Sequence, residues 1–457
     1  MSLILPANSL TGGYEIDNSL RFNSGSSDYL SRTYGTPTNN LKYTKSFWVK
    51  RSGLTDIAKG FIFSNSTNSN TDYFYFDASD KIVLGNNITP ATTAVYRDVS
   101  AWYHCVMVFD SANATADDRL ILYVNGIRQT LSSTISQNST GGNQSGVTYE
   151  IAHQGGQSRY LDGYLAEVCM IDGQALTPTD FGEFDDSGIW KPIKYTGTYG
   201  TNGFYLDFEN SGSLGADQSG NGNNFTVNNL TSIDQTTDTP TNNFATLNPL
   251  STVHTENISS MLSNGNVDYT PSGDYSIVKS TIPFGTTGKW YVETKINSAV
   301  GGSAGLGIQR LPATSYATNS LLAYQCNDYC YDYTADGYIN KGASSPTAIT
   351  SGLTNWTAGD IVAMLFDADN NEIKWYVNDT LIYTLDLSTA PDGYYINDGE
   401  WVFALFGYAG DGTFNINFGN PSISIVSSNS DANGYGNFEY DTKSGYALCT
   451  KNLAEFG

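Results

Sequence analysis

Two stretches that lie far apart in the chain repeat nearly the same phrase, and this repeat constrains the fold more than any other feature. "HCVMVFDSANATADDRLILYVNG" runs from His104 to Gly126, and "DIVAMLFDADNNEIKWYVND" runs from Asp360 to Asp379. In each, an apolar run ends in Phe-Asp, a polar and turn-rich stretch follows, and a second run ends in Tyr-Val-Asn. Both patterns predict a β-hairpin.

The first strand of each hairpin is apolar on both faces. Side chains two positions apart on a strand share a face, and in Cys105–Phe109 and Val362–Phe366 both alternating sets are apolar. A strand of this kind lies between two packed layers. We therefore expect two sandwich domains built on a common theme, with two unrelated hairpins as the alternative.

The composition is typical of an all-β chain. At ~150 residues per domain, a chain of 457 residues is long enough for two or three domains. It contains 46 Gly and 32 Tyr, and no long stretch has the period of an amphipathic helix. The predicted fold class is all-β, with two antiparallel β-sandwich (jelly-roll-like) domains in tandem.

The formal net charge is −23, from 45 acidic and 22 basic residues. Nucleic acids and anionic membranes are bound by clustered Lys and Arg, so we expect no nucleic-acid partner and no membrane insertion. The first residues, "MSLILPANSLTGG", lack the basic region of a signal peptide. We therefore expect the chain to fold in a cytosol.

The five cysteines do not suggest a metal centre. Cys105 and Cys169 stand in strand-like runs, as small core residues would. Only Cys326 and Cys330 are close in sequence, whereas a structural zinc site needs four ligands. We therefore expect no zinc and no cofactor.

The sequence offers little for catalysis. Jelly-roll glucanases place three carboxylates on one strand face, and the three Glu-x-Asp pairs here are followed at the next alternate position by Ser19, Ser187 and Lys443. "GGSAG" at Gly301–Gly305 lies between two strand runs and is interpreted as a hairpin loop. We therefore expect that the protein is not an enzyme. The alternative is a soluble glycoside hydrolase on a jelly-roll fold.

One segment, "DQSGNGNNF", has the alternate spacing of a calcium loop. The candidate metal ligands are Asp217, Ser219, Asn221 and Asn223. The twelfth position, which in a calcium loop is a bidentate acid, is Asn228. A tight Asn-Gly turn is the preferred interpretation, and a weak calcium site is the alternative.

A tyrosine-rich segment, "YQCNDYCYDYTADGYINKG", is the candidate ligand-binding surface, because sugar sites combine aromatic rings with Asn and Asp. The candidate residues are Tyr324, Tyr329, Tyr331, Tyr333 and Tyr338. Of these, Tyr329, Tyr331 and Tyr333 share one face and also fit the alternative of ordinary strand residues.

Four elements follow one another in the first part of the chain: Phe-Trp-Val at Phe47–Val49, Trp-Tyr-His at Trp102–His104, the Tyr-Val-Asn-Gly turn, and the strand Asp162–Val168. Over residues 19 to 190 their order resembles the laminin G-like, concanavalin A-like jelly roll, which implies a first domain at 1–200. Residues 201–250 are expected to form a connector that either completes this sandwich or is an elaborated linker. The alternation of Phe204, Leu206 and Phe208 favours completion.

Five further elements, from "GKWYVETKI" at Gly288–Ile296 to "WVFALFGYAGDGTFNINFG", lie in the order found in SPRY domains. This resemblance implies a second β-sandwich at 251–428, followed by a tail at 429–457. One departure is Asp379, where that family has Gly. The turn can still form, because Asn and Asp tolerate left-handed backbone conformations.

Taken with the connectors "DQSGNGNNFTVNN" and "TDTPTNNFATLNP" and the tail "GYALCTKNLAEFG", this order resembles structural proteins of tailed marine bacteriophages. The resemblance implies a virion component such as a fibre, a spike, or a capsid or tail decoration protein. It would be present in many copies beside other virion proteins and assembled in the bacterial host cytoplasm. Host surface glycans are expected as additional partners.

Overall fold

The computed structural model describes residues 13–65, 71–86, 89–251, 258–272, 276–298, 300–301, 304–311, 330–342, 347–389 and 399–457. The chain forms two compact units, Met1–Asn243 and Phe244–Gly457. Nearly all regular structure in the described residues is antiparallel β-strand, so the predicted fold class is confirmed. Within those residues, no helix has both the length and the apolar character needed to cross a lipid bilayer.

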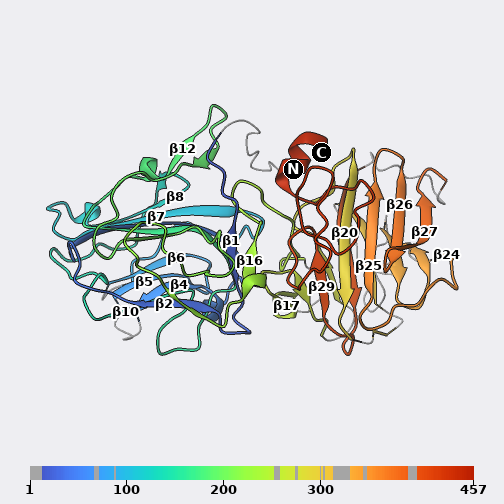
Figure 1. The fold of residues 1–457 in the computed structure, drawn as a ribbon, viewed down its shortest axis with the longest axis horizontal. Helices are drawn as coiled ribbons and strands as arrows, with labels where there is room; N and C mark the ends of the chain where they lie inside the picture. The colour runs from blue at the N-terminus through green and yellow to red at the C-terminus, as the bar shows by residue number, and fades with distance from the viewer. Residues whose placement is uncertain are drawn as a thin grey trace. The chain divides into compact units, whose positions relative to one another are not determined.

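The first unit is a sandwich of two antiparallel sheets, which Figure 1 shows as two layers. The eight-stranded sheet has the order β16-β1-β11-β3-β7-β8-β9, with β14 paired to β11, and the six-stranded sheet has the order β15-β2-β10-β4-β5-β6. The elements are β1 (Ser19–Phe22), β2 (Tyr29–Thr33), β3 (Lys42–Arg51), η1 (Ile57–Lys59), β4 (Phe61–Asn65), β5 (Thr71–Phe76), β6 (Ile82–Asn86), β7 (Trp102–Asp110), η2 (Ala116–Asp118), β8 (Leu120–Val124), β9 (Ile127–Arg128), β10 (Thr148–Ile151), β11 (Gly163–Asp172), η3 (Pro178–Asp180), β12 (Gly182–Phe184), β13 (Trp190–Pro192), β14 (Phe204–Leu206), β15 (Thr226–Asn228), η4 (Ser232–Asp234) and β16 (Gln235–Thr236).

The segment after the jelly roll adds strands to both sheets of this sandwich. β14 pairs with β11, β15 pairs with β2, and β16 pairs with β1. Phe204, Leu206 and Phe208 all lie in the core between the sheets. Residues 204–236 are therefore part of the first unit.

The strand β7 is covered on both faces, as its sequence predicts. Cys105, Met107 and Phe109 lie in the core between the two sheets. Val106 and Val108 pack instead on the outer face of the eight-stranded sheet, against a layer that includes Phe181, Tyr195 and Tyr199. The chain between η3 and β14 thus forms a third, partial layer over this sheet.

The second unit is also a sandwich of two antiparallel sheets. The seven-stranded sheet has the order β17-β18-β29-β20-β25-β26-β27, and the six-stranded sheet has the order β19-β28-β21-β22-β23-β24. The elements are η5 (Ile258–Met261), β17 (Leu262–Ser263), β18 (Asp268–Tyr269), β19 (Ser276–Lys279), β20 (Lys289–Ile296), β21 (Gly305–Leu311), β22 (Cys330–Thr334), β23 (Ile339–Lys341), β24 (Thr347–Thr350), β25 (Ile361–Asp367), β26 (Glu372–Val377), β27 (Thr380–Asp386), β28 (Glu400–Gly407), β29 (Phe414–Asn417) and α2 (Thr450–Phe456).

The residues at 429–457 cover the outer face of β25. Ala363 and Leu365 pack there against Phe438 and Ala447. The buried carboxylate of Glu293 fixes this segment by accepting hydrogen bonds from the backbone N–H groups of residues 439 and 440, each at 2.9 Å. The central strand of each unit is therefore covered by chain that follows its own jelly roll.

Candidate functional site

A bulge in β11 gives the first unit its most unusual side-chain environment. The pairing of β11 with β3 shifts register between Ala166 and Cys169, and Glu167 adopts a φ of 51°. A positive φ in a residue other than Gly costs on the order of 1 kcal/mol and is found most often where function constrains the backbone. Bulges also redirect a side chain. Glu167 is therefore the first residue to consider for function.

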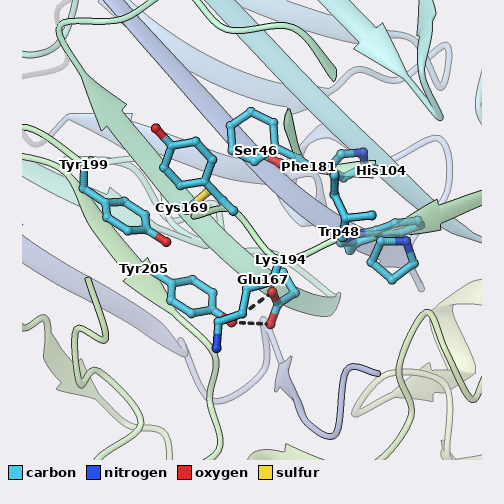
Figure 2. A pocket seen from close by; sticks show the side chains of 12 residues that line it. Ser46, Trp48, His104, Glu167, Cys169, Phe181, Lys194, Tyr199 and Tyr205 are labelled. Atoms are coloured by element: carbon cyan, nitrogen blue, oxygen red, sulfur yellow. Dashed lines mark hydrogen bonds between the residues drawn. The ribbon is translucent and has the colours of Figure 1, made fainter. Parts of the chain in front are cut away.

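Glu167 lies in a small pocket on the outer face of the eight-stranded sheet (Figure 2). The floor is formed by side chains of the sheet, and the walls come from the covering layer between η3 and β14. The residues that line it include Ser46, Trp48, His104, Glu167, Cys169, Phe181, Lys194, Tyr195, Tyr199 and Tyr205.

The Glu167 carboxyl group is held by two tyrosines. Tyr205 donates from its hydroxyl to both carboxyl oxygens, at 2.8 and 2.9 Å, as Figure 2 shows. The Tyr14 hydroxyl donates to Oε2 at 2.9 Å and lies 3.0 Å from the Tyr205 hydroxyl. Burial raises the pKa of Glu167 to about 7, although these hydrogen bonds oppose the rise. Near neutral pH the carboxyl group therefore exists in both protonated and ionised forms.

His104 is part of the floor and has a structural role. Its Nδ1 accepts a hydrogen bond from Trp190 Nε1 at 2.9 Å, so the ring proton resides on Nε2, which donates to Ser46 Oγ at 2.8 Å. The ring stacks against Trp48 and Trp190. Burial lowers the pKa of His104 to about 3, so the imidazole is neutral. Both ring nitrogens are occupied by these hydrogen bonds, which leaves the histidine unsuited to act as a base.

The groups at the pocket mouth are suited to a polyhydroxylated ligand. Lys194 is exposed, and the rings of Tyr195 and Tyr199 are half-buried. Together with Glu167 they offer a cation, hydroxyl groups, aromatic faces and a carboxyl group that can accept or donate a hydrogen bond. An aromatic wall beside a few polar groups is the usual composition of a small-molecule site.

The predicted calcium loop is internally hydrogen-bonded. Both Asp217 oxygens accept bonds, Oδ1 from the backbone N–H of Tyr205 and Ser219, and Oδ2 from Ser219 Oγ and the backbone N–H of Asn223. Asn221 and Asn223 donate from Nδ2 to backbone carbonyls of residues 200–203. No group of three or more His, Cys, Asp or Glu side chains in the described part of the chain could hold a metal ion.

The five tyrosines of the predicted ligand-binding surface do not form one exposed platform among the described residues. Tyr324 and Tyr329, like Cys326, lie outside the described residues. Tyr331 and Tyr333 are fully buried on β22, where they pack near Trp401 and Trp356. For these two positions a core role replaces the expected surface platform, because their shared face points into the sandwich. Tyr338 is 39% exposed.

One feature of the sequence points to Glu167. In "GYLAEVCMI", Glu167 is the only charged residue in an otherwise apolar strand. Its partners Tyr14 and Tyr205 are separated from it by 153 and 38 positions, so no local pattern links them. A lone acid in a buried strand would have identified Glu167 but not its partners.

One family model and several solved structures are similar to parts of this chain. Residues 24–180 match the family model described as the concanavalin A-like lectin/glucanases superfamily, which confirms the laminin G-like resemblance of the first unit. Similar solved structures include a human SPRY domain, with 13% identity over 35% of this chain and 91% of that chain and a TM-score of 0.25. A putative carbohydrate binding protein from Bacteroides ovatus has 15% identity over 47% of this chain and 59% of that chain, with a TM-score of 0.36. The carbohydrate binding module CBM66 from Bacillus subtilis has 13% identity over 33% and 81%, with a TM-score of 0.23. Among curated proteins, none matches the chain.

Proposed function

We propose that the chain is a non-enzymatic structural protein of a bacteriophage virion and that its first unit binds host surface glycans through the Glu167 pocket. The observation that carries the binding role is the buried Glu167 carboxyl group with its two tyrosine partners, beside half-buried aromatic rings. The first unit matches a superfamily named for lectins and glucanases, which supports a carbohydrate ligand. The virion role rests on the resemblance of the order of sandwiches and connectors to marine phage proteins.

Weak binding at this pocket is compatible with the proposed role. The pocket itself is smaller than a sugar ring, so a glycan unit would contact these groups only at the mouth of the pocket, and we expect affinity in the millimolar range. A virion carries its structural proteins in many copies, and multivalency converts weak single-site contacts into firm attachment. We therefore expect other virion proteins as partners and the virion as the location.

Binding is tested by saturation-transfer NMR of the full chain with capsular and O-antigen polysaccharides from marine bacteria. Glu167→Gln and Tyr195→Ala should each weaken binding by roughly tenfold, which corresponds to about 1.4 kcal/mol. Tyr338→Ala, which changes an exposed tyrosine of the second unit, is the matched control. Loss of binding in the control alone would place the glycan at the tyrosine-rich segment instead.

The virion role is tested with antibodies against the purified chain and intact phage particles. We expect the chain at fixed stoichiometry in particles, and a monomer or weak oligomer in analytical ultracentrifugation, since the sequence has no heptads for a coiled coil. A chain found only in lysate and never in particles contradicts the proposal.

A glycoside hydrolase is the second candidate, and one observation favours it. Asp207 is a half-buried carboxyl group whose charge helps raise the pKa of Glu167, and burial raises the pKa of Asp207 itself. Two neighbouring carboxyl groups can act as acid and as nucleophile or base in glycoside hydrolysis. Release of reducing sugar by the wild type, abolished in both Glu167→Gln and Asp207→Asn, would favour the hydrolase over the binding protein.

A further inference from the structure

A lysine, an asparagine and an aspartate meet in the interior of the first unit, away from the pocket residues discussed above. Lys50 Nζ lies 2.7 Å from Asn243 Oδ1 and 2.7 Å from Asp238 Oδ2. The side chains of Lys50 and Asp238 are at most 1% exposed, and Asn243 is 5% exposed. An amine, a carboxamide and a carboxyl group are therefore held together out of contact with water.

The backbone fixes the lysine firmly. Lys50 lies on β3, in register between Trp102 of β7 and Tyr164 of β11. It points to the outer face of the eight-stranded sheet, where its ammonium group lies 5.6 Å from the centre of the Tyr164 ring. Its neighbours on both sides are hydrogen-bonded strands, so the amine has little freedom to leave this position.

Hydrogen bonds also fix the position of the chain after β16, which carries Asp238 and Asn243. Ser19 Oγ donates to the Asp238 carbonyl at 2.6 Å, and Thr241 exchanges two hydrogen bonds with the backbone of Ile16, each at 3.0 Å. The Asn243 side chain donates from Nδ2 to the Ser100 carbonyl at 2.5 Å, which directs its carboxamide at Lys50. The reacting groups are thus preorganised by contacts at both ends of the segment.

The environment makes the Lys50 amine easier to deprotonate than an exposed lysine. Burial lowers the pKa of Lys50, while Asp238 opposes this effect. A buried ion pair loses hydration that its attraction only partly restores. Attack requires the neutral amine, so Lys50 must pass one proton to the adjacent Asp238 in the course of the reaction. Trp102 Nε1 donates to Asp238 Oδ1 at 3.2 Å and holds that side chain in place. A neutral amine is the nucleophilic form of lysine.

We propose that Lys50 and Asn243 form an intramolecular isopeptide bond, with Asp238 as the group that transfers the proton. The lone pair of Lys50 Nζ attacks Cγ of Asn243, and Asp238 gives its proton to the departing nitrogen and takes up the proton that Nζ must lose. The Cγ–Nδ2 bond breaks, ammonia leaves, and a new amide joins Nζ to Cγ. Amine and carboxamide become a secondary amide plus ammonia, so the step needs neither an oxidant nor another reactant.

A second buried lysine in the same unit has a carboxylate partner but no carboxamide partner, and so provides a comparison for Lys50. Lys45 Nζ lies 2.6 Å from Asp72 Oδ2, and both side chains are 1% exposed. The partners of Asp72 there are the hydroxyls of Tyr43 and Tyr149. Among the described residues, Lys45 has Asp72 and aromatic rings as neighbours and no hydrogen-bonded carboxamide. This pair is a conventional buried ion pair, whereas the Lys50 cluster also contains a carboxamide that can acylate the amine.

The bond would have a mechanical consequence. Asn243 is the last residue of the first unit, and the chain continues from it into the second. A covalent link from Asn243 to β3 would transmit tension on residues 244–457 to a central strand of the sheet. Without the link, the same tension would first detach the short strands β16, β15 and β14.

The proposal is tested by intact mass spectrometry of the purified full chain under denaturing and reducing conditions. The expected mass is lower than that of the sequence with the same N-terminus by one ammonia. Peptide mapping should recover a branched peptide that joins Lys50 to Asn243, with no tryptic cleavage after Lys50. A wild-type chain of full mass overturns the proposal, and so does loss of ammonia without the branched peptide, which would indicate a succinimide.

Variants separate the roles of the three residues. Asp238→Asn and Asn243→Ala should have the full sequence mass, whereas Asn243→Asp should lose water in place of ammonia. Asn242→Ala removes the adjacent carboxamide and should still lose ammonia. Bond formation in Asp238→Asn would overturn the role of Asp238. If these variants fail to fold, the wild-type mass and its peptide map still decide the question.

Discussion

The asparagine that ends each Tyr-Val-Asn phrase makes the same contacts in both units. Asn125 Oδ1 accepts the backbone N–H of His104 at 2.8 Å, and Asn378 Oδ1 accepts that of Ile361 at 3.0 Å. Both asparagines have left-handed backbones, with φ of 47° and 46°, and each is followed by a second residue of positive φ. Asn tolerates this conformation and also provides the acceptor, which explains why the phrase recurs.

Substitutions at Asn378 should separate these two contributions. Asn378→Gly removes the Oδ1 acceptor and the Nδ2 donor to Asp360 Oδ1, and should reduce the free energy of unfolding by about 1 kcal/mol. Asn378→Ala loses the same bonds and keeps a Cβ at positive φ without the amide that lets Asn tolerate this conformation, so we expect a further loss of about 1 kcal/mol. Urea denaturation of the full chain measures both. Equal stabilities of the two variants would show that backbone conformation contributes nothing here.

The Glu167 carboxyl group should make stability depend on pH. Its pKa rises from 4.5 to about 7 on folding, so the folded state binds the proton more tightly than the unfolded state. Its stabilising contribution is full below pH 4.5 and is lost as the pH rises through 7. The melting temperature of the wild type should therefore fall between pH 5 and 8 relative to that of Glu167→Gln.

Asp28 provides the control for that measurement, because burial raises its pKa to about 6 in the same unit. Asp28→Asn should remove only the part of the pH dependence that falls between about pH 4 and 6. If the difference in melting temperature between the wild type and Glu167→Gln is constant from pH 5 to pH 8, Glu167 does not titrate as described.

At the scale of elements, each unit is organised around one hairpin, β7–β8 or β25–β26, whose first strand is covered on both faces. Trp102 is 7% exposed and Trp375 is fully buried, as the hairpin patterns predict. Trp375→Ala should cost about 3–5 kcal/mol, because a large buried side chain leaves a cavity that its neighbours fill only partly. Tyr338→Ala is the exposed control. An unchanged melting temperature for Trp375→Ala would contradict a central role for this hairpin.

The turn at Asp217 is an element of structure in its own right. Asp217 accepts four hydrogen bonds, including one from the backbone of β14. Asp217→Ala should therefore cost about 1–3 kcal/mol even in the absence of metal. Chelator should leave the melting temperature of the wild type unchanged. A rise of several degrees on adding calcium, absent in Asp217→Ala, would instead establish a metal site.

The hairpins could be predicted from sequence because alternation is a local property of neighbouring residues. The left-handed turn at Asp379, with φ of 68°, followed from the tolerance of Asp for that conformation. The Glu167 pocket could not be predicted, because it depends on a bulge and on Tyr14 and Tyr205, which are brought together by tertiary structure. Tyr331 and Tyr333 illustrate the same limit, since alternation shows that they share a face but not whether that face meets the core or solvent.

At the scale of the whole molecule, the first unit ends well beyond its jelly roll. The strands β14, β15 and β16 supply neighbours to β11, β2 and β1, and the segment that carries them contributes buried rings and aliphatic chains to the core. These core residues are Phe204, Leu206, Phe208, Leu214, Phe225 and Leu230. A fragment that lacks them would expose the matching apolar surface of both sheets.

Two fragments that differ only in this segment test the point. Residues 1–243 should fold alone and melt in one cooperative transition, because a unit of this size buries a core of its own. Residues 1–200 end after the jelly roll but lack six core side chains, each worth roughly 1.5–3 kcal/mol when fully buried. That sum is as large as the stability of a typical domain, which is about 5–15 kcal/mol, so the shorter fragment should be unfolded or aggregated. Circular dichroism and thermal melts of both fragments measure this. If the 1–200 fragment melts as cooperatively as the 1–243 fragment, the returning strands are an accessory to the first unit and its core is complete without them.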